Sequence, residues 1–135
     1  MSSQRKTNGS EPHHRILLLE DDPRHGDMVA QALHANAHGD EVLRVDSGPA
    51  FADALESFEP DVVLSGSVAG LEPREALVMS RQRHPEVPVV LITETVDRSV
   101  VESLRAGAAD FVGMQELDRL PATVDTALAE RAPLR

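Results

Sequence analysis

The chain has 135 residues, the length of a single domain, which is enough to bury a hydrophobic core. Its formal net charge of −10 argues against binding to nucleic acid or to an anionic membrane surface. The absence of cysteine excludes disulfides and thiolate metal sites and fits a reducing compartment. No apolar run is long enough to span a membrane, and no signal-peptide pattern is present. We therefore predict a cytoplasmic protein.

The first 14 residues are polar and lack periodicity, so they predict a disordered tail. Residues 15–131 carry the patterned part of the chain and predict one domain, followed by a short tail at 132–135. His13 and His14 are adjacent in the predicted tail. They are more typical of solvated residues than of a metal site, which needs further ligands at fixed geometry.

Short apolar runs predict five strands, and the third of them is the centre of the pattern. Its Val-Val-Leu core, bounded by Pro60 and by Gly66, predicts a strand buried on both faces, as in a parallel sheet. The five predicted strands are Arg15–Leu19, Glu41–Val45, the Asp61–Ser67 stretch, Pro88–Thr93 and Asp110–Gly113.

Segments with helical spacing of apolar residues separate these strands. The first helix is predicted from Pro23 to about Ala37, with Met28 and Val29 on its inner face. The others are predicted to begin after Asp46-Ser47-Gly48, at Pro73, near Asp97, and at Asp118 to Pro121. Alternating strands and helices predict an α/β three-layer sandwich with a parallel sheet.

Three acidic residues, Glu20, Asp21 and Asp22, follow the first strand directly. One of them, most simply Asp22, is expected to cap the next helix, with Pro23 at its first position. Two hard oxygen ligands at a strand tip also suit a divalent cation such as Mg²⁺. The spacing alone leaves both interpretations open.

Four segments in order resemble the receiver domain of two-component response regulators, over roughly Arg15 to Arg131. The resemblance implies a flavodoxin-like (CheY-like) fold with strand order 2-1-3-4-5 and a site at the strand tips. The four segments are Ile16 to Asp22, Pro60 to Leu64, Pro88 to Thr93, and Arg105 to Val112.

In that family an aspartate at the end of the third strand accepts a phosphoryl group from a histidine kinase. Mg²⁺ is held by the acidic pair and that aspartate, while a Thr or Ser and a Lys bind the phosphoryl oxygens. The chemistry requires a carboxylate nucleophile and cations that offset the charge on the transferred group.

Part of this pattern is retained. The resemblance places Glu20 and Asp21 at the acidic pair, Thr93 at the hydroxyl switch position and Phe111 at its aromatic partner. Thr93 and Phe111 either still exchange between two arrangements or simply pack within a fixed docking surface. A weak Mg²⁺ site at Glu20 and Asp21 is also expected, although no cofactor is required.

The reactive positions depart from the pattern. Gly66 stands at the phosphoacceptor position and Met114 at the lysine position, with Gln115 in place of the following proline. Glu94 replaces the small residue that usually follows the threonine. Glu20, Asp21 and Glu94 are thus expected to crowd together without the usual lysine. This crowding should either raise the pKa of one carboxylate or recruit a cation.

These departures predict a pseudo-receiver that is not an enzyme and acts by phosphorylation-independent protein contact in two-component signalling. The expected partner is a histidine kinase, an effector or a second copy of the chain. The expected contact face is formed by the fourth helix, the fifth strand and the fifth helix.

The alternative is a receiver that is still phosphorylated, at Ser65 or Ser67, and acts in a phosphorelay. An alcohol at this site lacks an activating base and the lysine charge. Asp61 is expected to lie roughly 16 Å from Gly66 along the strand, too far to substitute as acceptor. An unrelated flavodoxin-like binder of flavin or nucleotide is disfavoured, because no glycine-rich phosphate loop follows the first strand.

Overall fold

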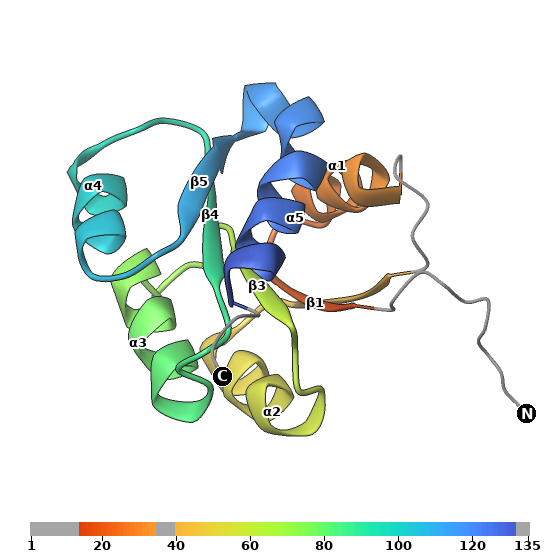
Figure 1. The fold of residues 1–135 in the computed structure, drawn as a ribbon. Coiled ribbons are helices and arrows are strands. Elements are labelled where there is room, and N and C mark those ends of the chain that lie inside the picture. The colour runs from red at the N-terminus through yellow and green to blue at the C-terminus, as the bar shows by residue number, and fades with distance from the viewer. Residues whose placement is uncertain (1–13, 35–39, 132–135) are drawn as a thin grey trace, which may run out of the picture.

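A computed structural model describes residues 14–34 and 40–131 (Figure 1). The strands are β1 (Arg15–Leu19), β2 (Glu41–Val45), β3 (Val62–Ser65), β4 (Val89–Thr93) and β5 (Asp110–Gly113). The helices are α1 (Pro23–His34), α2 (Gly48–Ser57), α3 (Pro73–Arg83), α4 (Arg98–Arg105), the 3₁₀ helix η2 (Met114–Arg119) and α5 (Leu120–Arg131).

The five strands form one parallel sheet in the order β2-β1-β3-β4-β5. This confirms the predicted flavodoxin-like architecture and its strand order. β3 lies at the centre, between β1 and β4, and each of its residues is buried. β2 lies at the edge, and its side chains are largely exposed or half-buried, as its weaker pattern predicts.

Helices cover both faces of the sheet (Figure 1). On one face, Leu17, Val63 and Leu91 pack in a core with residues of α2, α3 and α4. On the other face, Leu18 and Leu64 pack with residues of α1 and α5. Side chains of one strand alternate between the two cores because successive residues point to opposite faces. The sheet is therefore buried on both sides, and only its edges and strand ends are open to ligands.

Side-chain caps fix the start of several helices. The Ser47 hydroxyl accepts a hydrogen bond from the Ala50 N–H at 3.2 Å at the start of α2. The Asp97 carboxylate accepts one from the Val100 N–H at 3.2 Å at the start of α4. α4 is followed by Gly107 with φ +121, a conformation that favours glycine and ends the helix there.

The structure corrects the prediction for the inner face of α1. Met28 is 45% exposed, whereas Gly26, Val29 and Leu33 are buried. The buried positions are spaced by three and four residues, and Met28 falls beside this stripe on the turn. The predicted end of this helix near Ala37 lies outside the described residues.

The ends of the domain also differ from prediction. His14 was expected in a disordered tail, yet its N–H donates to Asp40 Oδ1 at 3.3 Å and its carbonyl accepts from the Glu41 N–H at 2.9 Å. It thus extends the pairing of β1 with β2. At the other end, α5 begins at Leu120, within the predicted start at Asp118 to Pro121, and η2, which was not predicted, precedes it. The predicted tails at 1–13 and 132–135 lie outside the described residues.

Among residues 14–34 and 40–131, no helix combines the length and the apolar character needed to cross a bilayer.

Candidate functional site at the strand tips

The carboxyl ends of the parallel strands bring the expected site residues to one edge of the sheet. Glu20 follows β1, Gly66 follows β3, Thr93 ends β4 and Met114 follows β5. A backbone hydrogen bond joins the ends of β1 and β3 here, because the Gly66 N–H donates to the Leu19 carbonyl at 2.7 Å. Ligands bind at this edge in open α/β sheets.

At the tip of β3, Gly66 leaves no space for a side chain. A Cβ atom placed there would collide with Glu20 Oε1 and would lie 2.9 Å from the Leu19 carbonyl oxygen. The Glu20 carboxylate therefore occupies the space beside position 66. The inward position of the Glu20 side chain is possible because residue 66 has no side chain.

Glu20 is 2% exposed, which is unusual for a carboxylate. Its Oε2 accepts a hydrogen bond from the Asp22 N–H at 3.1 Å, and its Oε1 accepts one from the Ser67 N–H at 3.3 Å. Its backbone carbonyl accepts a bond from Arg44 Nη1 at 2.8 Å. Glu20 thus connects β1, α1 and the loop after β3.

A histidine that the sequence analysis did not single out faces these acids. His25 Nδ1 lies 3.7 Å from Glu20 Oε2, and its Nε2 lies 3.4 Å from Glu94 Oε2 and 4.0 Å from Asp22 Oδ2. This ring therefore lies among three carboxylates at the strand tips. Its position in the first turn of α1, three residues after Asp22, is the sequence signal that points to it.

The other two acids of the cluster each bind a backbone N–H. Asp21 Oδ2 accepts from Ala69 at 2.8 Å, and Asp22 Oδ1 accepts from Arg24 at 2.9 Å. The predicted capping role of Asp22 is confirmed. The Arg24 N–H, and then the Arg24 guanidinium and His25, hold the pKa of the Asp22 carboxyl below its ordinary value of 3.8.

These residues do not fit a Mg²⁺ site of the receiver type. Both oxygens of Glu20 accept backbone hydrogen bonds within a buried space, and Asp21 Oδ2 is bound to the loop after β3. Among the described residues, no group of three or more His, Asp or Glu side chains is arranged to hold a metal ion. The weak Mg²⁺ site expected at Glu20 and Asp21 therefore stays a prediction, and these hydrogen bonds disfavour it.

The two switch residues lie on neighbouring strands. Phe111 pairs with Leu91 in the sheet and is half-buried against the core under α4. Thr93, two residues further along β4, donates a hydrogen bond to the Thr95 carbonyl at 2.5 Å, which turns its hydroxyl toward its own loop. Met114 packs in the opposite core, with α1 and α5, rather than over the strand tips.

The two serines that flank Gly66 have different surroundings. The Ser65 hydroxyl is buried and has no hydrogen-bond partner, whereas Ser67 is exposed. Asp61 lies at the opposite end of β3, where its Oδ2 accepts a hydrogen bond from the Arg15 N–H at 2.8 Å. Of these three side chains, only Ser67 is exposed at the strand tips.

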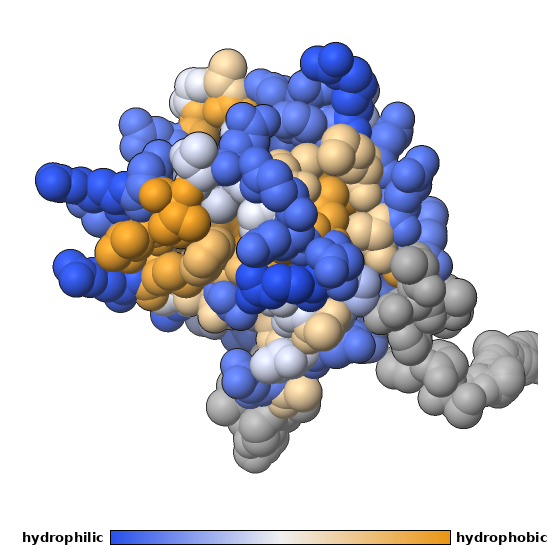
Figure 2. Space-filling view, turned by 90° about the horizontal axis from the view of Figure 1, so that it is seen from above, coloured by the Kyte–Doolittle hydropathy of each residue, from blue (hydrophilic) through white to orange (hydrophobic). Residues whose placement is uncertain are grey.

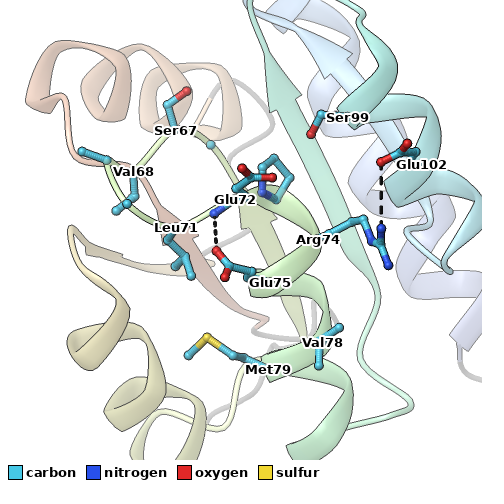
Figure 3. Close-up of a pocket in the computed structure, with 14 residues that line it drawn as sticks. Ser67, Val68, Leu71, Glu72, Arg74, Glu75, Val78, Met79, Ser99 and Glu102 are labelled. Atoms are coloured by element: carbon cyan, nitrogen blue, oxygen red, sulfur yellow. Dashed lines mark hydrogen bonds and ion pairs between the residues drawn. The ribbon is translucent and has the colours of Figure 1, made fainter.

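A groove begins at Gly66 and Ser67 and continues between α3 and α4, with a volume of about 1060 Å³ (Figure 3). Arg74 of α3 reaches across toward α4, where Nη1 lies 3.9 Å from Glu102 Oε1. Glu75 turns back to accept a hydrogen bond from the Glu72 N–H at 2.9 Å. Both interactions are exposed to solvent, so the groove is open.

No family model matches the sequence. The chain is 34% identical over 101 residues to the response regulator protein FleR of Pseudomonas aeruginosa, a match that covers 73% of this chain and 21% of FleR. It is 31% identical over 122 residues to the nitrogen assimilation regulatory protein NtrX of Azorhizobium caulinodans, covering 85% of this chain and 26% of NtrX.

Solved structures agree with these relatives. Full-length FixJ from B. japonicum superimposes with a TM-score of 0.78 at 28% identity, over 89% of this chain and 60% of FixJ. The response regulator domain of Thermotoga maritima CheB shares the fold, with a TM-score of 0.76 at 19% identity over 87% of this chain and 98% of that domain. The chain carries a response-regulator receiver domain.

This receiver domain spans about a fifth to a quarter of the length of the curated relatives it matches. It has the fold and the strand-tip edge of the family, and its context is two-component signalling. At that edge the receiver domain has Gly66 at the tip of β3, with the Glu20 carboxylate beside it and His25 next to Glu20.

Proposed function

We propose that this receiver domain is a pseudo-receiver, which signals by protein contact without being phosphorylated. The observation that carries the proposal is the tip of β3, where Gly66 offers only backbone and the Glu20 carboxylate fills the adjoining space. Phosphoryl transfer in a receiver needs a carboxylate that an incoming phosphoryl group can reach, and Glu20 is buried.

The charges around the site support the same proposal. Glu94 is exposed at 63% of its side chain and adds an anion at the entrance of the site. Met114 supplies no charge at the lysine position. Because the phosphoryl group carries negative charge, a site bordered by Glu20 and Glu94 without a lysine disfavours its approach.

We further propose that the face formed by α4, β5 and α5 contacts a histidine kinase, an effector or a second copy of the chain. Val96, just before α4, and Val101 within it are exposed apolar side chains. Figure 2 shows hydrophobic residues gathered on the side where α3 and α4 lie in Figure 1, a side that shares α4 with this face but not α5. A partner that binds one arrangement of Thr93 and Phe111 more tightly would bias the domain toward it.

The proposal is tested by incubating the protein with acetyl phosphate and Mg²⁺ and measuring its intact mass. We expect no phosphoryl adduct, while a receiver domain with the usual aspartate, treated in parallel, gains one. An adduct that disappears in Ser67→Ala, but not in Ser65→Ala, would instead establish the phosphorelay role through Ser67. Any other adduct would also contradict the proposal.

A further inference from the structure

We propose that the strand tips form a binding site for a carboxylate anion, and that the side chain of Glu20 is its ligand, supplied by the chain itself. This inference deepens the proposed function, and it rests on that function in one respect, namely that no phosphoryl group enters the site. The parts of the site are the N–H groups of Asp22 and Ser67 and the ring of His25, here called the cradle.

The two N–H groups of the cradle come from different parts of the chain and bind different oxygens. Asp22 N–H lies at the start of α1 and binds Oε2, while Ser67 N–H lies in the loop after β3 and binds Oε1. His25 Nδ1 lies 3.7 Å from Oε2, on the α1 side. Donors converge on both oxygens of one planar group, which is the geometry that a carboxylate requires.

The burial of the ligand makes its hydrogen-bond partners in the cradle important. The Glu20 side chain is only 3% exposed. Removing an ionised carboxylate from water is strongly unfavourable unless hydrogen bonds and an opposite charge replace its hydration. The two N–H donors replace part of that hydration, so an empty cradle would leave two part-buried donors without an acceptor.

Gly66 makes room for the ligand. A Cβ at position 66 would collide with Glu20 Oε1, so any other residue there would displace the carboxylate from the Ser67 N–H. The glycine at 66 and the glutamate at 20 are therefore matched to one another. The site is filled by its own anion and is not simply a receiver site that has lost a side chain.

The inference is tested by removing the ligand and supplying a small carboxylate from solution. In Glu20→Ala, we expect a lower melting temperature than in the wild type, and a saturable recovery when sodium acetate is added. Sodium chloride at the same ionic strength should change the melting temperature of Glu20→Ala less, and without saturation. In the wild type, both salts should give only this small, non-saturating change. Equal effects of acetate and chloride on Glu20→Ala would overturn the inference.

Two further variants control for a general loss of packing. Glu20→Gln fills the space but keeps only one acceptor oxygen, so an amide N–H₂ faces one of the two donors. It should be destabilised without responding specifically to acetate. Asp21→Ala removes the neighbouring exposed carboxylate, which binds Ala69 N–H outside the cradle, and should also lack an acetate response. An acetate-specific recovery in either control would contradict the assignment of the cradle.

A second measurement remains informative if Glu20→Ala does not fold. Amide hydrogen exchange in Glu20→Gln should accelerate at Ser67 or Asp22, whichever faces the amide N–H₂, while the Ala50 amide at the start of α2 keeps its wild-type rate. Unchanged exchange at Ser67 and Asp22 would overturn the inference. The proposed function fails separately, if wild-type protein gains a phosphoryl group, whether or not acetate binds the variant.

Discussion

At the scale of single residues, the match between Gly66 and Glu20 has a measurable energy. Gly66→Ala should lower the free energy of unfolding by about 1–3 kcal/mol, because the added methyl meets Glu20 Oε1 and lies 2.9 Å from the Leu19 carbonyl oxygen. Urea denaturation measures this change. Gly48→Ala is the matched control, since its Cβ would lie 3.9 Å from Leu71 Cδ2, an ordinary contact.

Combining Gly66→Ala with Glu20→Ala distinguishes the two contacts of the added methyl group, one with Glu20 Oε1 and one with the Leu19 carbonyl oxygen. The double variant should lose less stability than the sum of the single variants, because the collision with Oε1 is gone and only the Leu19 carbonyl remains close. Strictly additive effects would mean that Glu20 does not occupy the space beside position 66.

The capping carboxylate of Asp22 makes part of the stability depend on pH. Its pKa is lowered in the folded state, chiefly by the Arg24 N–H, so folding favours the ionised form. The stabilisation is therefore complete above the ordinary value of 3.8 and is lost as the pH falls through the lower folded value. Asp22→Asn keeps a capping oxygen but removes the charge.

Urea denaturation of the wild type and Asp22→Asn at a series of pH values measures this contribution. The wild type should be the more stable protein at neutral pH, and the difference should shrink as the pH falls below 3.8. A difference that grows on acidification would show that the sign is wrong.

At the scale of secondary structure elements, α4 has only eight residues and depends on its cap. Asp97→Ala removes the acceptor for the Val100 N–H and should cost about 1 kcal/mol of stability. We expect amide exchange to accelerate within α4, because a short helix is marginal without its terminal bonds. Ser47→Ala, which removes the same kind of cap from α2, should leave exchange in α4 unchanged.

The elements themselves could be predicted from the sequence because the pattern is strong. Buried runs such as Val62 to Leu64 and helix signals such as Pro73 and Gly107 fix most boundaries to within a few residues. Met28 was wrongly assigned to the inner face of α1 because it is adjacent to Val29, which is buried. Helical spacing of apolar residues does not distinguish two neighbouring positions at the border of the buried stripe. η2 was missed because a 3₁₀ turn has no periodic signature of its own.

The site could be predicted only in part. The positions of Glu20, Gly66 and Thr93 follow from the strand ends, because parallel strands end at one edge of the sheet. The inward rotation of Glu20 and its contact with His25 could not be predicted, since they depend on side-chain conformation and on how α1 packs beside β1. The packing of Met114 against α1 and α5 likewise depends on η2.

At the scale of the whole molecule, the strand-tip geometry predicts little response to divalent cations. MgCl₂ should change the melting temperature no more than NaCl at equal ionic strength, because the Glu20 oxygens are bound within the protein. Differential scanning calorimetry measures this. A saturable gain with MgCl₂ alone would show instead that Glu20 and Asp21 still bind the ion, and its loss in Asp21→Ala would locate the site.

The carboxylate held beside Gly66 is covalently part of the chain, so it is present at a fixed and high local concentration from the moment the domain folds. A phosphoryl group can be added by one enzyme and removed by another, and the lifetime of the phosphorylated state then sets the duration of a response. A built-in anion has no such lifetime. The duration of signalling by this domain would therefore depend on the synthesis and degradation of the protein and on the abundance of its binding partner.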